Sequence, residues 1–435
     1  MEEHKRFGRR VFLKSAAIAG VGLGLAACAP STAPSGGAAG APSAEEEREI
    51  TLMAWDMEGF DSFNAEFTAE TGIDVSQAVF PQGVWSDVMN KFALWSQTGY
   101  SGYDLTIADD LIAGMMAANG FAAELGDYDF WTEHEDDTVE GIHTLNSVLN
   151  GVYRIFFLLD LEPFFHYTAL VPEAPKTWDQ LITFGKDATN ADEDVWGWRP
   201  TNGVGHEFNT VLLMLNQAGA DLDTLDDAGT LEAFQFMQDW VFTHEITPKS
   251  TTSEGNDQIA NLSALGKAGM WWNYTGGYRN ALEHEQSVLT MENAPAARWP
   301  MGPASDIGLI HGWGWMLPKV GEKKDLAIEY LTWFSQPEVL KKFIINVHRD
   351  APPRYSLIND PDVIEAVPTL ALPVGWETIL AGAKFREPIV NKKPVNELWS
   401  MFQNIGRFIF SAEKTPEETQ QWAVTEYQRI MADAG

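Results

Sequence analysis

Short apolar segments typical of strands alternate with amphipathic helical segments after residue 48, and this alternation constrains the fold more than any other feature. The strand-like segments are 50–55, 73–80 and 105–108. A segment of helical spacing follows each of them, at 61–71, 84–97 and 110–119. Strands that alternate with helices form a parallel sheet covered by helices. The sequence therefore predicts an α/β fold, and it contains no tandem repeat.

Further predicted elements extend this pattern toward the C-terminus. We expect strands at 268–273 and 308–317, and helices at 178–186, 206–218, 325–334, 337–346, 394–411 and 416–432. Thr177 is placed to cap the first of these helices, and either Asp227 or Thr230 can start a helix that ends near residue 242. Gly72 and Gly219 suit the left-handed position that follows a helix.

Length and charge limit the classes of function. A chain of 435 residues exceeds one comfortable core, so two domains are expected. The 29 basic and 62 acidic side chains give a formal net charge of -33. This charge repels polyanions at long range, so we expect no nucleic-acid partner. Solubility, or adaptation to a salty medium, is enough to explain the charge itself, so the charge does not by itself indicate a function.

The N-terminal segment has the order of an export signal followed by a lipidation site. Residues 9–14 (RRVFLK) resemble a twin-arginine motif, and an apolar stretch follows at 16–27. This stretch is too short to span a bilayer as a helix, which needs about 20 residues. Residues 25–28 (LAAC) resemble a bacterial lipobox, so we expect a signal peptide over 1–27 and acylation of Cys28, the only cysteine. The lipidated cysteine and the small-residue segment after it, 28–47, would form a flexible tether.

Aromatic and acidic side chains follow two of the predicted strands. Trp55 and Asp56 follow the first strand, and Asp109 and Asp110 follow the third. In an open α/β sheet, ligands bind outside the carboxyl ends of the strands. An aromatic face packs against sugar C–H groups and a carboxylate accepts hydrogen bonds from hydroxyls, so these residue types predict a sugar or polyol site. Alternatively, Trp55 belongs to the core, Asp56 to a turn and Asp110 to a helix N-cap.

Five short motifs occur in a fixed order between about residue 50 and residue 345. They lie at 67–75 (FTAETGIDV), 175–181 (PKTWDQL), 266–270 (GKAGM), 312–319 (GWGWMLPK) and 327–338 (AIEYLTWFSQPE). In this order they resemble the motifs of the sugar-type bacterial extracellular solute-binding proteins, the binding subunits of ABC importers. Two segments depart from the family pattern: Tyr103-Asp104 replaces its Pro-Asp, and 164–167 (FFHY) replaces its Tyr-Asn.

The resemblance implies a two-lobe α/β fold of the type II periplasmic-binding-protein class, with a mostly parallel sheet flanked by helices in each lobe. One lobe would comprise 48–157 with 309–352, and the other 158–308 with 353–435, joined by a hinge. A solute in the cleft would favour a closed form that the permease recognises. The resemblance also implies a monomer without a cofactor, exported by the twin-arginine route and held outside the cytoplasm by the lipid on Cys28.

The candidate ligand contacts come from the first lobe, the second lobe, the strand that returns between them and one later arginine. In that order they are Trp55, Asp56, Trp85, Asp109 and Asp110; Trp272, Tyr274 and Tyr278; His311, Trp313 and Trp315; and Arg354. Arg354 can clamp vicinal hydroxyls with two parallel hydrogen bonds. Aromatic residues in strands are often core residues, and this alternative applies to Trp272, Tyr274 and Trp315.

Two other functions stay open at the level of the sequence. A surface-anchored glycoside hydrolase would also have a tryptophan-lined cleft, with two carboxylates such as Asp56 and Asp109 about 5–10 Å apart. A carbohydrate sensor that serves no transport would have the same fold. We expect no metal site, because no cluster of thiolates or histidines has metal-ligand spacing. The solute itself is open between a neutral sugar and a cation held in an aromatic cage.

Overall fold

The computed structural model describes residues 48–81, 85–100, 102–139, 147–149, 151–203, 205–370, 383–386, 389 and 391–434. The predicted signal peptide, lipidation site at Cys28 and tether lie outside the described residues, as does the side chain of Trp85. Residues Arg48–Gly435 form one compact unit. None of the helices within the described ranges is long and apolar enough to cross a membrane.

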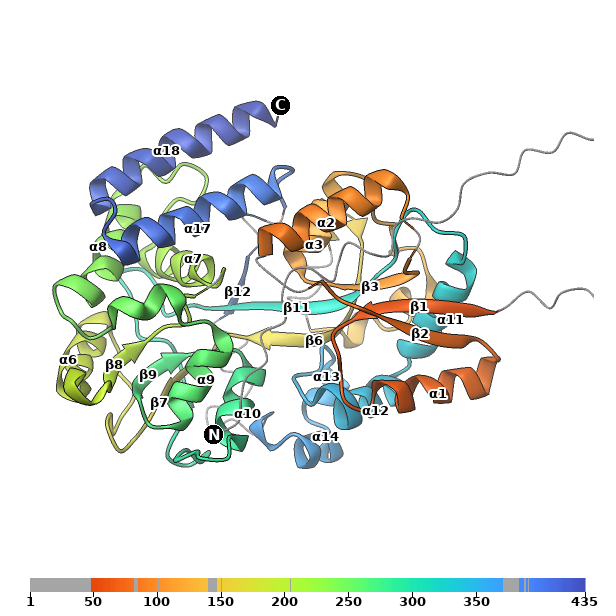
Figure 1. Cartoon of the computed structure of the whole chain (residues 1–435), viewed down its shortest axis with the longest axis horizontal. Coiled ribbons are helices and arrows are strands. Elements are labelled where there is room, and N and C mark those ends of the chain that lie inside the picture. Colours follow the sequence, from red (N-terminus) through yellow and green to blue (C-terminus); the bar gives the residue numbers. More distant parts are fainter. Residues whose placement is uncertain are drawn as a thin grey trace, which may run out of the picture. The chain divides into compact units, whose positions relative to one another are not determined.

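The larger sheet has six strands in the order β12-β11-β3-β1-β2, with β6 paired to β11 as well. Its strands are β1 (Glu49–Ala54), β2 (Asp74–Val79), β3 (Leu105–Ala108), β6 (Ile155–Leu161), β11 (Gly308–Met316) and β12 (Ala383–Phe385). β1 is parallel to β2 and β3, as the β-α alternation predicts. β11 is antiparallel to β3 and β6, and β11 and β6 run side by side across the middle of the view in Figure 1.

The smaller sheet has four strands in the order β10-β7-β9-β8. Its strands are β7 (Phe164–His166), β8 (Trp196–Arg199), β9 (Ala268–Trp272) and β10 (Ala296–Ala297). β8 and β9 are parallel, whereas β7 is antiparallel to both β9 and β10. This sheet is therefore mixed and not mostly parallel as expected. β7 enters this sheet directly from β6 of the larger sheet, two residues earlier, and runs opposite to the parallel pair of β8 and β9.

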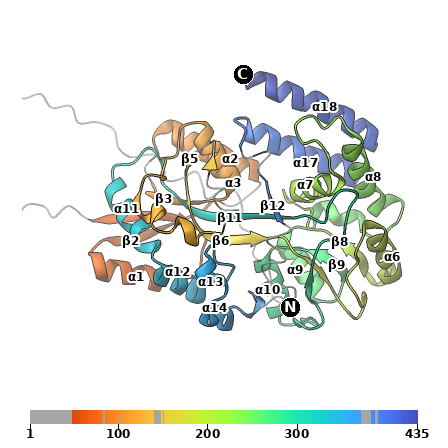
Figure 2. The same ribbon diagram turned by 180° about the vertical axis from the view of Figure 1, so that it is seen from behind.

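Helices surround both sheets. On or beside the larger sheet lie α1 (Phe60–Thr71), α2 (Trp85–Thr98), α3 (Asp110–Ala118), α4 (Asp129–Thr132), α11 (Lys324–Phe334), α12 (Pro337–Phe343), α13 (Tyr355–Ile358) and α14 (Pro361–Ala366). Beside the smaller sheet lie α6 (Trp178–Ala188), α7 (Glu207–Ala218), α8 (Ala228–Phe242), α9 (Asn256–Ala264) and α10 (Thr275–Glu283). The last two helices, α17 (Val395–Ser411) and α18 (Pro416–Asp433), pack against α7 and α8 (Figures 1 and 2). A separate two-stranded pair joins β4 (Ser147–Val148) and β5 (Gly151–Val152).

Local sequence signals set several helix ends as predicted. Oγ1 of Thr177 accepts a hydrogen bond from the backbone N–H in the first turn of α6 (3.3 Å). Asp227, rather than Thr230, caps α8. Gly72 and Gly219 adopt positive φ angles of 69° and 75° at the ends of α1 and α7, a conformation that costs glycine little. These caps fix the lengths of the connections that lead back to the strands.

Candidate functional site

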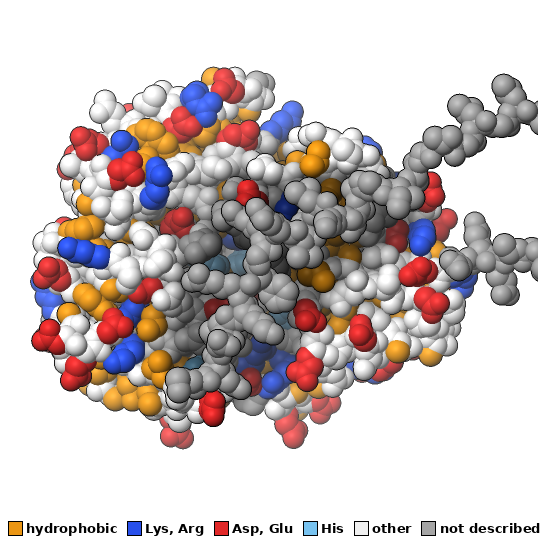
Figure 3. Space-filling view, viewed as in Figure 1, with side chains coloured by type: hydrophobic (Ala, Val, Ile, Leu, Met, Phe, Trp, Pro, Cys, Tyr) orange, Lys and Arg blue, Asp and Glu red, His pale blue; other side chains and the backbone are white. Residues whose placement is uncertain are grey.

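A cavity of about 740 Å³ lies among elements of both sheets. It is lined by residues that follow β1 and β3, by residues on β6 and β11, by the first turns of α7, α9 and α10, and by the residue after β12. Histidine side chains, in pale blue, are visible near the centre of the face in Figure 3. The volume of the cavity is within the range of small-molecule binding sites.

Two strands end at the cavity, as the rule for open α/β sheets predicts. Asp56 follows β1, and Asp109 follows β3. Oδ1 of Asp109 accepts a hydrogen bond from the N–H of Ile112 (2.9 Å), so Asp109, and not Asp110, caps α3. The second oxygen of Asp109 stays available for the buried cluster described below.

A row of four polar side chains crosses the larger sheet at the cavity. Asp160 on β6 is paired with His311 on β11. On the other side of β6, an antiparallel bridge joins the residue before Asp160 to the residue after Asp350. Asp350 therefore lies opposite Asp160. β12 is parallel to β11, and the register places Arg386, directly after β12, beside His311. Residues opposite one another in neighbouring strands share a face, so the row runs Asp350, Asp160, His311, Arg386, and all four line the cavity.

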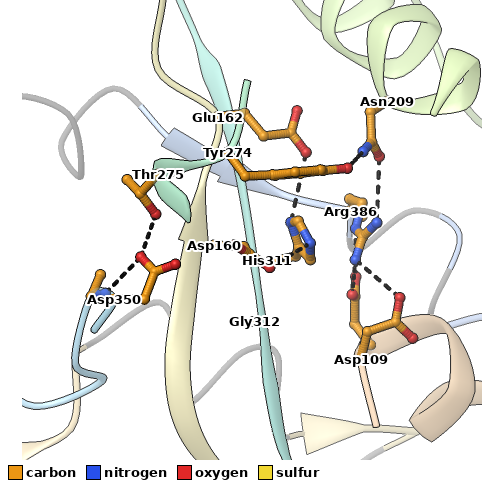
Figure 4. Close-up of polar contacts among 12 residues, drawn as sticks. Asp109, Asp160, Glu162, Asn209, Tyr274, Thr275, His311, Gly312, Asp350 and Arg386 are labelled. Carbon is orange, nitrogen blue, oxygen red and sulfur yellow. Dashed lines mark hydrogen bonds and ion pairs between the residues drawn. The ribbon is translucent and has the colours of Figure 1, made fainter. Parts of the chain in front are cut away.

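Arg386 ends this row in a buried ion cluster (Figure 4). Its Nε donates to Oδ2 of Asp110 (2.9 Å), and its Nη2 donates to the other oxygen of Asp110 and lies 3.5 Å from Oδ2 of Asp109. Its Nη1 donates to Oδ1 of Asn209 (3.4 Å), whose amide donates to the hydroxyl of Tyr274 (2.8 Å). Burial acts to lower the pKa of Arg386, but the charges of Asp110 and Asp109 outweigh burial and raise that pKa. The guanidinium therefore stays charged and holds the cluster together.

Burial controls the protonation of the other polar groups at the site. It lowers the pKa of His206 to about 4 and that of His348 to about 3, and it lowers the pKa of His311 well below its ordinary value. The three imidazoles are therefore neutral at pH 7. Burial also raises the pKa of Asp109 to about 6 and that of Glu162 to about 8. Oε1 of Glu162 lies 3.6 Å from Nδ1 of His311.

Two tryptophans form an aromatic wall of the cavity. The rings of Trp55 and Trp313 meet edge to face, with centroids 4.4 Å apart and an interplanar angle of 70°. The ring of Phe80 packs against both of them, at 6.2 Å from Trp55 and 5.7 Å from Trp313. Both tryptophans are only half-buried, so parts of their rings can pack against a sugar or a cation.

The cavity brings together half of the predicted ligand contacts. Those that line it are Trp55, Asp56, Asp109, Tyr274, His311 and Trp313. Trp85 begins α2, and its side chain lies outside the described part of the structure. That the six predicted side chains at the cavity contact a solute stays a prediction.

Two predicted aromatic contacts, Trp272 and Tyr278, lie in the core and do not line the cavity. The indole N–H of the fully buried Trp272 donates to Oγ1 of Thr210 (3.0 Å). The ring of Tyr278 stacks on Phe165, with centroids 4.3 Å apart, and its hydroxyl is already bonded to a backbone carbonyl. Both side chains are packed and hydrogen-bonded within the core, so neither is retained as a candidate ligand contact.

Trp315 is also a core residue and not a ligand contact. It lies two residues beyond Trp313 on the same face of β11, at a point where α1 and α11 cover the sheet. Phe60 stacks on its ring at 6.1 Å, and Tyr330 meets it edge to face at 6.0 Å. Trp315 is fully buried, whereas Trp313 borders the cavity.

Two predicted polar contacts, Asp110 and Arg354, do not reach the cavity either. Asp110 is fully buried behind it and binds Arg386, so it positions the arginine. Arg354 donates to the carbonyl of Ser335 and lines a separate small cavity beside His134. Its guanidinium is therefore directed away from the predicted site.

Several residues that line the cavity are not among the predicted contacts, for example Asp160, His206, Asp350 and Arg386. A carboxylate within the apolar run 155–161 (IFFLLDL) is a signal that points to Asp160. The others have no local signal, because segments far apart in the sequence bring them together. Within the described residues, no group of three or more histidine, cysteine, aspartate or glutamate side chains could hold a metal ion.

Comparison with known proteins gives one family and distant relatives. The family model described as bacterial extracellular solute-binding protein matches residues 63–371. A probable amino-acid ABC transporter periplasmic-binding protein of Sinorhizobium fredii is 20% identical over 201 residues, which cover 45% of this chain and 44% of that protein. The arabinooligosaccharide-binding protein of Halalkalibacterium halodurans is 23% identical over 199 residues, 43% of each chain. The chain thus spans less than half the length of these curated relatives.

A solved structure extends the likeness to almost the whole described chain. The maltose-bound MalE3 protein of T. maritima has a TM-score of 0.74 and 18% sequence identity, over 88% of this chain and 99% of that chain. At this identity the likeness concerns the fold, and it confirms the predicted two-lobe fold class.

Proposed function

Because the chain belongs to the family of bacterial extracellular solute-binding proteins, we propose that it binds a small sugar-like solute in the cavity and delivers it to the permease of an ABC importer. The observation that carries this proposal is the cavity itself, in which the half-buried Trp55 and Trp313 accompany a row of polar side chains. Aromatic rings pack on sugar C–H groups, and carboxylates accept hydrogen bonds from hydroxyls. The names of two relatives, one arabinooligosaccharide-binding and one maltose-bound, support the same class of solute.

We propose that the solute contacts the predicted residues that line the cavity, together with Asp160 and Asp350. The two predicted lobes, 48–157 with 309–352 and 158–308 with 353–435, would close on it. β12, α13 and α14 differ from this division, because they lie with the larger sheet, and they would move with the first lobe. A solute that contacts residues of both sheets would stabilise the closed form by its additional contacts. This requires cavity residues from both sheets, and Tyr274 after β9 and Trp313 on β11 meet that requirement.

A member of an extracellular family acts outside the cytoplasm. We propose in addition that the chain is a monomer, is exported by the twin-arginine route and is held at the membrane by acylated Cys28. Cys28→Ser should then release the chain from the membrane fraction, whereas Ser31→Ala, in the same segment, should leave it there. If both variants stay in the membrane fraction, the lipid anchor is contradicted.

The proposed function is tested by a binding screen of the purified full-length chain against neutral mono- and oligosaccharides, sugar alcohols and amino-substituted sugars. A solute at about 100 times its Kd stabilises the folded chain by about 2.7 kcal/mol, which raises the unfolding temperature measurably. Trp313→Ala should reduce the shift. Trp422→Ala, which changes another half-buried tryptophan that does not line the cavity, should keep it.

The outcomes separate the candidate functions. A shift without chemical change of the sugar supports a binding protein. Hydrolysis of an oligosaccharide by the pure chain would instead favour the glycoside hydrolase. No shift with any sugar, charged or neutral, contradicts the proposed function.

A further inference from the structure

The charges around the cavity are unequal. Among the described residues, five carboxylates line it, whereas only two guanidinium groups do so. These groups are Asp56, Asp109, Asp160, Asp257 and Asp350 on one side and Arg279 and Arg386 on the other. Arg386 is already bound to Asp110 and lies beside Asp109, and the histidines of the cavity are neutral. The cavity therefore has an excess of negative charge.

This excess is concentrated at one end of the polar row, at Asp160 and Asp350. Directly opposite residues in antiparallel strands have Cα atoms about 4.5–5.5 Å apart, and like charges at such positions repel each other. Within the described part of the chain, neither carboxylate forms an ion pair with a lysine or arginine. The partners of Asp160 are neutral: they are His311, at 3.4 Å, and the side chain of Trp313, which donates a hydrogen bond to it. Burial, followed by the charge of Asp350, raises the pKa of Asp160 well above its ordinary value.

Two guanidinium groups act on this end of the row, but both are engaged elsewhere. The charge of Arg386, which is bound to Asp110, lowers the pKa of Asp160 by less than burial raises it. Arg279 acts on Asp350. Its charge lowers the pKa of Asp350, although burial raises that pKa by more. Its Nη1 donates to the backbone carbonyls of His348 (3.0 Å) and Arg349. Arg279 therefore does not neutralise both carboxylates.

Asp350 has one oxygen that faces an open space. Its Oδ1 accepts hydrogen bonds from Oγ1 of Thr275 (2.6 Å) and from the N–H of Ala351 (2.8 Å), whereas no described residue donates to its Oδ2. Asp350 is only 4% exposed and lines the cavity, so this oxygen is directed to the site of the solute. Gly276 keeps the approach free, since a Cβ at that position would lie 3.0 Å from Oδ2.

We propose that the solute carries a positively charged amino group, which binds to Asp160 and Asp350. The inference rests on the proposed sugar-like solute and narrows it to amino-substituted sugars. An ammonium group has three donors, and its hydrogen bonds to carboxylates are stronger than those of a hydroxyl. One such group neutralises the end of the row that has no cation of its own. The ring faces of Trp55 and Trp313, in the same cavity, add a cation–π attraction.

The test is isothermal titration calorimetry of the full-length chain with glucosamine, galactosamine and the disaccharide of two glucosamines. Each is compared with its N-acetylated form, which keeps the sugar ring but has no charge. At least one amino form should bind about 30-fold or more tightly than its acetylated form. This factor corresponds to about 2 kcal/mol, the lower end of the cost of removing one partner from a buried charged pair.

Three variants locate the amino group. Asp350→Asn keeps the size of the side chain and the acceptor for Thr275, and it should abolish the preference for the amino form. Gly276→Ala should weaken the preference, because the added methyl group crowds Oδ2. Asp257→Asn is the matched control, since it removes an exposed carboxylate that lines the same cavity, and it should keep the preference. If Asp350→Asn does not fold, Asp160→Asn replaces it with the same expected loss.

Each other outcome overturns the inference. If the acetylated or unsubstituted sugars bind as tightly as the amino forms, the solute is neutral, and the proposed sugar-binding function is unaffected. If the preference survives in Asp350→Asn or Asp160→Asn, the cation binds elsewhere. If no sugar binds in either form, both the inference and the proposed function fail.

Discussion

Arg199, at the end of β8 in the smaller sheet, and Arg386, at the cavity, are both buried next to two carboxylates, yet their surroundings differ. Arg199 donates Nη1 to Glu254 (2.8 Å) and Nη2 to Oδ1 of Asp194 (2.6 Å). It also donates to the backbone carbonyls of Lys267 (3.0 Å) and Asp194 (3.1 Å). The fold fixes these carbonyls, so Arg199 has one arrangement.

Arg386 has only side-chain partners within the described residues, and some of these contacts are long. Its Nη1 is 3.4 Å from Asn209, and its Nη2 is 3.5 Å from Asp109. Both contacts end on side-chain atoms, and the cavity adjoins the cluster. An ion cluster that ends on the backbone holds a fold, whereas one that ends on side chains at a cavity can adapt to a solute. Four substitutions test this difference.

Arg199→Met should have the largest effect. It leaves the buried carboxylate of Glu254 without its cation, and the loss of one partner of a buried ion pair lowers the free energy of unfolding by about 3–5 kcal/mol. Chemical denaturation measures this loss. Affinity for the solute, measured on the folded fraction, should not change. Arg407→Met is the control, because that arginine is 57% exposed in its pair with Glu413, and it should cost less than about 1 kcal/mol. Equal losses in the two variants would contradict a structural role for Arg199.

Arg386→Gln should lower both stability and affinity. The free energy of unfolding should fall by about 1–3 kcal/mol, less than for Arg199, because one of the two carboxyls can take up a proton. Asp109, whose pKa is about 6, is the carboxyl that does so most easily. Affinity should fall because Asn209 and Tyr274 lose the group that aligns them. Denaturation and calorimetry measure the two effects separately, and a loss of stability with unchanged affinity would make Arg386 equivalent to Arg199.

Trp313→Ala tests the same distinction along one strand. It should weaken solute binding by about 1–3 kcal/mol, because the solute loses an aromatic surface, and calorimetry measures this loss. Trp315→Ala, two residues further along β11, should instead lower the free energy of unfolding and leave the affinity of the folded chain unchanged, because it creates a void in the core. If both variants lose affinity equally, the assignment of Trp313 to the cavity and Trp315 to the core is wrong.

Much of the fold follows from the sequence because its signals are local. The strand at 105–108 and the helix from residue 178 lie where alternation and the cap at Thr177 predict them. The mixed pairing of the smaller sheet was missed, since no strand was predicted at 164–166, where β7 pairs with β9. Pairing of that kind is set by tertiary contacts, which no short window of sequence contains.

The candidate site divides in the same way. Asp56 and Asp109 could be predicted because they follow parallel strands, and the carboxyl ends of such strands meet at one edge. Asp350 and Arg386 could not, because they reach the cavity by pairing beside β6 and β11 from the distant C-terminal part of the chain. Trp313 and Trp315 occupy equivalent positions in one motif, and only the helices above them decide which is core.

Glu162→Gln should have the smallest effect, on the pH dependence of stability. Both carboxylate oxygens of Glu162 are buried and have no hydrogen-bond partner among the described residues, and burial raises the pKa of Glu162 from 4.5 to about 8. The folded chain therefore binds this proton more tightly than the unfolded chain, so the group favours folding below pH 4.5 and disfavours it increasingly as the pH rises toward 8. Between pH 6 and 7, the wild type should lose about 1.4 kcal/mol of unfolding free energy relative to Glu162→Gln.

Denaturation at the two pH values measures this difference, with Glu329→Gln at the surface as the control that should keep the wild-type pH dependence. If wild type and Glu162→Gln respond equally to pH, Glu162 is ionised in the folded chain. Its negative charge would then be balanced by a protonated His311, whose Nδ1 lies 3.6 Å from it. A charged His311 would place a positive charge beside Asp160 and remove part of the reason for a cationic solute. The smallest of these effects therefore bears directly on the chemistry of the solute.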